Sequence, residues 1–283
     1  MPRTEASYDR FAPSVSEHRE TVLLLHGTAS SGAQWRSLAE AMPHGWNVLA
    51  PDLCGYGEAA AWQGEGAFSL AAEAALAESV LGAGSERIHL VGHSYGGVVA
   101  LRLAAQWPER VQSLVLIEPV AFHLFRDAPA GSLDHRLLGE VRQVAELVWG
   151  SVASGDYRGG MAGFVDYWNG DGAWLQAKPE LQAALIRRLP KVALDYWAAL
   201  GESIQADGYG QIGAPSLILS GSRSPQPARR VAAIVGECLP NCRRLTIEGA
   251  GHMLPLTHKD AVNAAILEHL LRHSPARCHP AAA

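Results

Sequence analysis

Short apolar runs alternate with amphipathic stretches in the first and last parts of the chain. The apolar runs predict buried strands at 21–27, 46–51, 87–93, 113–118, 216–221 and 243–248, with a further short strand at 7–11. The amphipathic stretches predict helices at 35–42, 69–81, 95–106, 227–238 and 259–272. This alternation predicts an α/β protein with a doubly wound, mostly parallel sheet.

The alternation stops in the middle of the chain. Between residues 118 and 214, helical patterns at 133–149, 157–168 and 180–200 replace it. We therefore expect a helical cap over 119–212, inserted into an α/β core, and a frayed tail at the C-terminal end. The core would comprise residues 1–118 and 213–273, and the tail residues 274–283.

Aromatic residues gather in the same middle region. Of the 20 Phe, Trp and Tyr residues, 11 fall between 119 and 212. Some must pack the cap onto the sheet, but ligand sites are lined mainly by such side chains, so the surplus favours an apolar pocket. The candidate lining residues are Phe122, Trp149, Trp168 and Trp197.

A glycine-flanked serine follows the predicted strand at 87–93. The pentapeptide G-H-S-Y-G occupies residues 92–96 and leads into the predicted helix at 95–106. A serine at such a strand-to-helix turn needs a strained backbone with glycines close by, and the strain lifts its hydroxyl clear of the sheet. Ser94 is therefore the candidate nucleophile.

Two other strand exits carry residues that a nucleophilic serine requires. A polar loop, H-G-T-A-S-S-G at 26–32, follows the first strand and could aim the Thr28 N–H at a developing oxyanion, with the Tyr95 N–H as second donor. The sequence E-G-A-G-H at 248–252 follows the last strand, and its His252 is the candidate general base.

The order of these motifs resembles the α/β-hydrolase fold superfamily, in its single-domain esterase and lipase type. H-G followed by Thr28, P-D-L-C-G-Y-G at 51–57, G-H-S-Y-G-G at 92–97 and G-A-G-H at 249–252 occur in the order typical of that family. The resemblance covers nearly the whole chain. It implies a catalytic triad, an oxyanion hole and a cap above the site.

The catalytic acid departs from the family pattern. Most members have an aspartate soon after the strand that would here be 216–221, but no carboxylate occurs between residues 213 and 236. Glu118 directly follows the strand 113–118 and would open onto the same crevice as Ser94. Some members of the superfamily take their acid from this strand, so we expect Glu118 to orient His252. Asp52, Asp207 and Glu248 are the rivals, and Asp52 more readily organises its own loop.

The expected function is that of a serine hydrolase cleaving a carboxylic ester with a hydrophobic portion through an acyl-enzyme. Thioesters, lactones and activated carbon–carbon bonds use nearly the same parts and remain open. The alternative class is a non-catalytic ligand-binding protein with this fold, which the missing aspartate favours. A small apolar ester-type substrate is the expected partner, and the oligomeric state stays open.

Composition narrows the remaining possibilities. The net charge of −5 lacks the excess of basic residues that is typical of nucleic-acid-binding proteins, so no nucleic-acid partner is expected. No apolar run approaches membrane-spanning length and the first residues lack the apolar core of a signal peptide, so we expect a cytoplasmic protein. No His or Cys pattern suggests a metal, and no cofactor is expected. The four cysteines are expected to be reduced thiols, although a bridge between Cys238 and Cys242 is conceivable.

Overall fold

A six-stranded parallel sheet forms the centre of the computed structural model, which describes residues 20–81 and 87–275. Its strand order is β2-β1-β3-β4-β5-β6. The strands are β1 (Thr21–Leu25), β2 (Asn47–Leu49), β3 (Ile88–His93), β4 (Val111–Ile117), β5 (Ser216–Gly221) and β6 (Cys242–Ile247). The six strands predicted from residue 21 onward are confirmed, and the short strand predicted at 7–11 lies outside the described residues.

The strand order reverses beside β1. The chain passes from β1 to β2 on one side and then returns to place β3 on the other side. In open α/β sheets, the crevice for ligands lies outside the carboxyl ends of the strands at such a reversal. The loop after β1 (residues 26–32, the β1 loop) and the turn at Ser94 both start from this edge.

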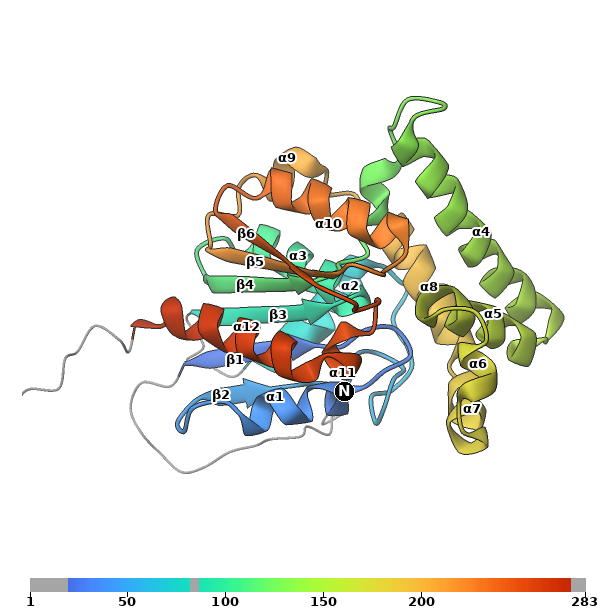
Figure 1. Ribbon diagram of the computed structural model, residues 1–283, viewed down its shortest axis with the longest axis horizontal. Coiled ribbons are helices and arrows are strands. Elements are labelled where there is room, and N and C mark those ends of the chain that lie inside the picture. The colour runs from blue at the N-terminus through green and yellow to red at the C-terminus, as the bar shows by residue number, and fades with distance from the viewer. Residues whose placement is uncertain (1–19, 82–86, 276–283) are drawn as a thin grey trace, which may run out of the picture.

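Helices cover both faces of the sheet (Figure 1). The side chains of β1 alternate between the two cores, with Leu23 and Leu25 in one and Val22 and Leu24 in the other. The first core contains α2 (Leu70–Glu78), α3 (Tyr95–Gln106) and α10 (Gln226–Cys238), and the second contains α1 (Arg36–Glu40) and α12 (Lys259–Arg272). Burial on both faces explains the continuous apolar runs at residues 22–25 of β1 and 114–117 of β4.

Five of the helices between β4 and β5 gather beyond one end of the sheet (Figure 1). They form the helical segment, residues 133–200: α4 (Leu133–Ser154), α5 (Tyr157–Asn169), α6 (Ala173–Gln176), α7 (Pro179–Ile186) and α8 (Leu189–Leu200). The prediction of one helix at 180–200 is wrong. Pro190 has no N–H for the carbonyl of Ile186 and its ring would clash there, so α7 ends at Ile186.

Shorter elements complete the described chain. They are η1 (Gly32–Trp35), η2 (Phe122–Phe125), α9 (Ala206–Tyr209) and α11 (Leu254–Thr257).

Two expectations about the chain end and the cysteines can be compared with the structure. Ser274, which was expected in a frayed tail, is buried, and its Oγ donates to Glu20 Oε1 at 2.6 Å. Residues 276–283 of the expected tail lie outside the described part. Cys54, Cys238 and Cys242 are free thiols, so the conceivable Cys238–Cys242 bridge is not formed.

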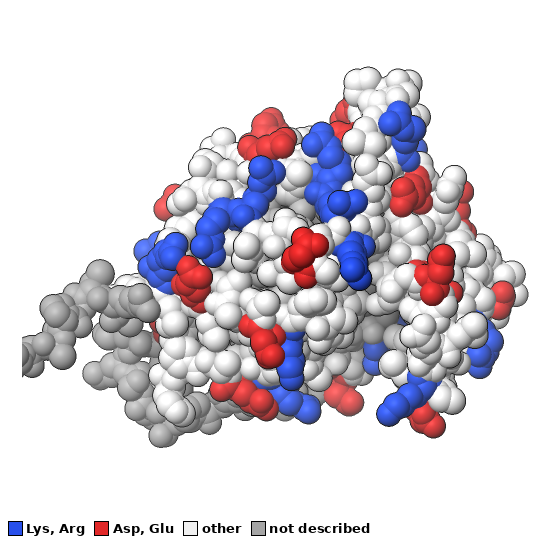
Figure 2. All heavy atoms as spheres, in the orientation of Figure 1, with Lys and Arg blue, Asp and Glu red and all other residues white. Residues whose placement is uncertain are grey.

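The outer surface carries charges of both signs. On the face drawn in Figure 2, Lys and Arg side chains lie among Asp and Glu side chains over a largely uncharged surface. Within residues 20–81 and 87–275, no helix is long and apolar enough to cross a membrane.

His26, the first residue of the β1 loop, is completely buried. Its Nε2 accepts the N–H of Leu53 at 2.9 Å, which leaves Nδ1–H to donate to the Gly27 carbonyl at 2.8 Å. Only the neutral ring satisfies both contacts. Burial lowers the pKa of His26 from 6.5 to about 4.

We expect His26 to make the fold acid-sensitive. Because its folded pKa lies below its unfolded pKa, its contribution to stability is complete above pH 6.5 and is lost as the pH falls towards 4. A His26→Gln variant should therefore lose less unfolding free energy on acidification, by roughly 1.4 kcal/mol per pH unit between pH 6.5 and 4. Urea denaturation at several pH values measures this. The exposed His44→Gln control should follow the wild type, and parallel curves for His26→Gln and wild type would contradict the assignment.

Candidate active site

Ser94 sits at a strained turn between β3 and α3. Its backbone has φ 55° and ψ −116°, a conformation that costs a non-glycine residue about 1–3 kcal/mol. Its N–H donates to the Ile117 carbonyl at 2.9 Å, which fixes the turn to β4. A Cβ on Gly92 would lie 2.3 Å from the Gly96 oxygen, and one on Gly96 would lie 2.3 Å from the Leu25 oxygen. Both glycines are therefore needed for the close backbone packing of this turn.

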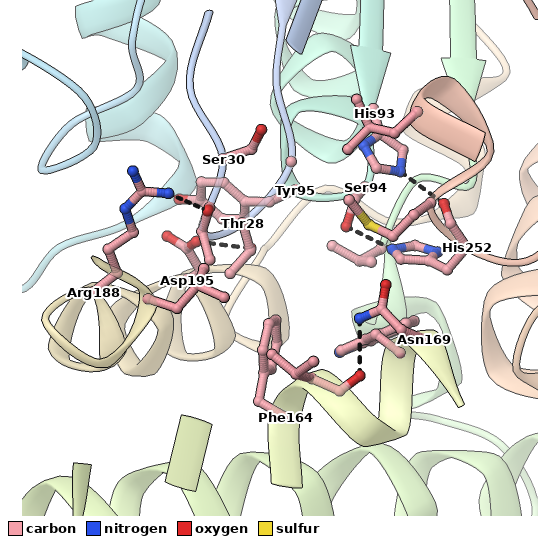
Figure 3. A pocket seen from close by; sticks show the side chains of 18 of the residues that line it. Thr28, Ser30, His93, Ser94, Tyr95, Phe164, Asn169, Arg188, Asp195 and His252 are labelled. Carbon is pink, nitrogen blue, oxygen red and sulfur yellow. Dashed lines mark hydrogen bonds between the residues drawn. The ribbon is translucent and has the colours of Figure 1, made fainter. Parts of the chain in front are cut away.

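Three side chains from separate strand ends form a hydrogen-bonded chain. His252 Nε2 lies 2.9 Å from Ser94 Oγ (Figure 3), and His252 Nδ1 lies 2.6 Å from Glu118 Oε2. The other carboxylate oxygen of Glu118 accepts the Gly221 N–H at 2.7 Å. Glu118 is fully buried and has a positive φ of 44°, so the backbone turns sharply directly after β4 to present the carboxylate. This arrangement has the geometry of a nucleophile, a base and an orienting acid.

The rival carboxylates lie elsewhere. Asp52 accepts the N–H groups of Gly32 and Glu58 and so organises its own loop, as expected. Asp207 accepts the N–H of its neighbour Gly208, and Glu248 accepts the hydroxyl of Ser222. In the part of the chain that the structure describes, Glu118 is thus the carboxylate that contacts His252.

The loop directly after β5, where the family resemblance implies an aspartate, reads S-R-S-P at residues 222–225. Ser224 is 3% exposed, and its Oγ is buried without a hydrogen-bond partner among the described residues. A hydroxyl at this position cannot replace a carboxylate beside a histidine, because it carries no charge to stabilise an imidazolium.

The backbone N–H groups of Thr28 and Tyr95 are the candidates for binding an oxyanion beside the serine. Thr28 in the β1 loop and Tyr95 at the start of α3 both line the same cavity as Ser94 and His252. Within residues 20–81 and 87–275, neither N–H donates to a protein acceptor. Free N–H groups beside a nucleophile are the donors that an oxyanion requires.

A second set of hydrogen bonds links the β1 loop to the end of β3 and to the loop after β6. Gly27 N donates to Gln34 Oε1 at 3.4 Å, and Gln34 Nε2 lies 3.2 Å from His93 Nδ1. His93 Nε2 donates to the carbonyl of His252 at 2.9 Å (Figure 3). Burial lowers the pKa of His93 to about 3, so the ring is neutral and accepts at Nδ1 while it donates at Nε2. Sequence reasoning missed this role, since a buried histidine beside the serine has no distinctive pattern.

An apolar cavity of about 480 Å³ opens above Ser94. The sheet core and the helical segment both contribute to its wall, and Figure 3 shows Phe164 and Asn169 of α5 near the Ser94–His252 pair. Apolar lining residues include Val120, Phe122, Phe164, Trp168, Leu185 and Leu256. A cavity of this size and lining suits a small, largely apolar ligand.

Two of the four expected pocket aromatics line the cavity. Phe122 and Trp168 do so, and the Trp168 ring lies 4.2 Å from the His252 ring, between centroids. The expectation for Trp149 and Trp197 is wrong. The centroids of these two rings lie 6.5 Å apart. Trp149 Nε1 donates to the Ala193 carbonyl, and Trp197 is 57% exposed. A helix presents only part of its aromatic residues to the ligand, and the outer face carries the others.

Among the described residues, no group of three or more His, Cys, Asp or Glu side chains is placed to hold a metal ion. The site is instead built from hydrogen-bonding and apolar groups.

Comparisons with known proteins identify the family of this chain. The profile of the alpha/beta hydrolase fold family matches residues 20–259. The chain is 30% identical to lipase LipV of Mycobacterium tuberculosis over 280 residues, covering 92% of this chain and 96% of the relative. It is 26% identical to the pimeloyl-[acyl-carrier protein] methyl ester esterase of Aeromonas hydrophila, covering 88% and 94%.

Solved structures show the same fold. The α/β hydrolase MGS-M2, from a Medee basin deep-sea metagenome library, superposes with a TM-score of 0.75 at 17% identity and covers 93% of both chains. MenH of S. aureus superposes with a TM-score of 0.70 at 20% identity. The family profile, the nearly full-length relatives and the ordered strand-end residues together establish that this chain belongs to the α/β-hydrolase fold family and is a hydrolase of that type.

Proposed function

We propose that this enzyme is a serine hydrolase that cleaves a carboxylic ester with a hydrophobic portion through an acyl-enzyme intermediate. The observation that carries the proposal is the chain from Ser94 through His252 to Glu118, which opens into an apolar cavity. Similarity to a lipase and to a methyl ester esterase supports an ester rather than another acyl substrate. Thioesters and lactones would use the same groups.

Acylation begins with attack by Ser94 Oγ on the ester carbonyl carbon. His252 Nε2 takes the hydroxyl proton, and the Glu118 carboxylate stabilises the imidazolium that forms. The carbonyl oxygen becomes an oxyanion, which the N–H groups of Thr28 and Tyr95 bind. When the tetrahedral intermediate collapses, His252 returns the proton to the leaving alcohol and the acyl group stays on Ser94.

Deacylation repeats these steps with water. His252 deprotonates a water molecule, the resulting hydroxide attacks the acyl-serine carbonyl, and the same N–H groups bind the oxyanion. Collapse returns a proton to Ser94 and releases the carboxylic acid. Since Glu118 also accepts the Gly221 N–H, its carboxylate keeps a fixed orientation through both half-reactions.

The helical segment acts as a cap over this chemistry. Its α5 and α8 supply Phe164, Trp168 and Ala199 to the cavity wall, while the sheet core supplies the reacting groups. An apolar wall binds the hydrophobic part of the substrate and strengthens the electrostatic contacts beside Ser94 by excluding water. We therefore propose the division into a core, residues 1–118 and 213–273, and a cap, residues 119–212.

The nucleophile assignment is tested by labelling and turnover. A fluorophosphonate probe should label the wild-type protein at Ser94, and Ser94→Ala should remove both the labelling and nearly all hydrolysis of p-nitrophenyl esters. Because members of a catalytic unit are not additive, Ser94→Ala combined with His252→Ala should be little worse than either single variant. Substantial turnover by purified Ser94→Ala would exclude this serine as the nucleophile.

The cavity should set a preference for acyl chain length. From acetyl to hexanoyl esters, we expect kcat/KM to rise by up to about fourfold per methylene, equivalent to about 0.8 kcal/mol, until the cavity is full. Leu185→Phe narrows the cavity and should move the optimum to shorter chains, whereas Leu175→Phe, on a side chain that is 83% exposed, should not. Equal kcat/KM values across the wild-type series would contradict a substrate site in this cavity.

A further inference from the structure

A cluster of charged side chains is buried where the helical segment meets the core. Lys191 and Asp195 lie one turn apart on α8 and are 7% and 2% exposed, and Glu73 on α2 is fully buried. None of the three takes part in the proposed proton transfers. Charged residues are almost never buried to this extent unless they are paired.

Lys191 joins the helical segment to the core. Its Nζ contacts Asp195 Oδ1 on its own helix and lies 3.1 Å from Glu73 Oε2 across the interface. The ammonium group also stands over the rings of Tyr56, Phe68 and Tyr95, at 4.7 to 4.8 Å from their centroids. These contacts fix the position of the lysine and, through it, that of Asp195.

The second oxygen of Asp195 reaches the β1 loop. Asp195 Oδ2 accepts the hydroxyl of Thr28 at 2.8 Å and that of Tyr56 at 2.6 Å, and Figure 3 shows the bond to Thr28 at the cavity wall. About two turns earlier, at the start of α8, the Arg188 guanidinium donates to the Ala29 carbonyl. Ala29 has a positive φ of 58°, so the loop is held in a strained conformation where these two contacts meet it.

The burial of these charges is unfavourable by itself. Burial raises the pKa values of the Asp195 and Glu73 carboxyl groups. Burial by itself lowers the pKa of Lys191, but the charges of Asp195 and Glu73 outweigh this effect, so the pKa of the lysine lies above its ordinary value. If apolar residues of similar volume replaced such buried charges, the stability of the fold would often be equal or higher. The cluster is therefore better explained by the geometry that it imposes than by stability.

We propose that Asp195, held in place by Lys191, positions the oxyanion donor of the β1 loop through the Thr28 hydroxyl. Thr28 would then donate its hydroxyl to Asp195 on the helical segment and its backbone N–H to the oxyanion. Asp195 and Lys191 are positioning residues in this account, which rests on the proposed function. The oxyanion hole is complete only when α8 is seated against the core.

Thr28→Val tests this link with little change of shape, because it removes the hydroxyl and keeps the backbone N–H. We expect kcat to fall by about tenfold with KM changed less than about twofold, a smaller loss than the 10²–10³-fold that follows removal of a donor. The affinity for a trifluoromethyl ketone, which forms a hemiketal oxyanion on serine, should fall by the same factor as kcat/KM. Thr28→Ser retains the hydroxyl and should restore wild-type values to within about twofold.

Asp134→Asn provides the matched control. Asp134 on α4 pairs with Arg230 on α10 at 2.7 Å, so this variant also breaks an ion pair between the helical segment and the core, but at a place with no contact to the β1 loop. Its kcat and its ketone affinity should stay at the wild-type values. If Asp134→Asn lowers both as much as Thr28→Val does, general loosening of the interface replaces positioning as the explanation.

Hydrogen exchange tests the link independently of turnover. Amides of residues 26–32 should exchange faster in Thr28→Val and in Lys191→Met than in wild type or Asp134→Asn. Should the wild type neither hydrolyse esters nor react with a fluorophosphonate, the proposed function fails, and exchange alone decides whether α8 holds the loop. The proposal would be overturned if the amides of residues 26–32 exchange in Thr28→Val at the wild-type rate. It would also be overturned if the wild type hydrolyses esters and Thr28→Val keeps the wild-type kcat and ketone affinity.

Discussion

The hydrogen bond between Glu118 and His252 is the interaction on which the proposed site depends. It spans the sheet from the end of β4 to the loop after β6, passing over β5, whose last residue Gly221 donates to the same carboxylate. Without a buried carboxylate here, His252 would have no partner to fix its tautomer or stabilise its charged form. The strained backbone at Glu118 and at Ser94 is the cost of bringing both side chains to one point.

Parallel strands and inserted helices make different contributions to the site. The sheet brings the carboxyl ends of β1, β3, β4 and β6 to one side, so the positions of Ser94, Glu118 and His252 follow from strand order. The helical segment encloses that edge and contacts the β1 loop through Asp195 and Arg188. In the proposed mechanism, α8 therefore links substrate binding to oxyanion stabilisation.

Sequence reasoning was most successful where a local pattern reflects a local constraint. The six strands and the strand-end placement of Ser94, His252 and Glu118 followed from apolar runs, glycine spacing and the absence of a carboxylate at 213–236. The split of the 180–200 helix at Pro190 was missed, although the proline signals it. The orientation of Trp149 and Trp197 and the Lys191–Asp195–Glu73 cluster depend on how distant helices pack, which local sequence does not encode.

The measurement that tests the central claim most directly is the steady-state rate of Glu118→Gln. This variant preserves shape but removes the charge opposite His252, so kcat should fall by several orders of magnitude, as much as about 10⁴-fold, while KM changes little and fold stability is retained. Glu248→Gln, which alters a carboxylate bonded to Ser222 on the neighbouring loop, should keep wild-type kcat. A fully active Glu118→Gln enzyme would contradict the account, because His252 would then be oriented by some other group.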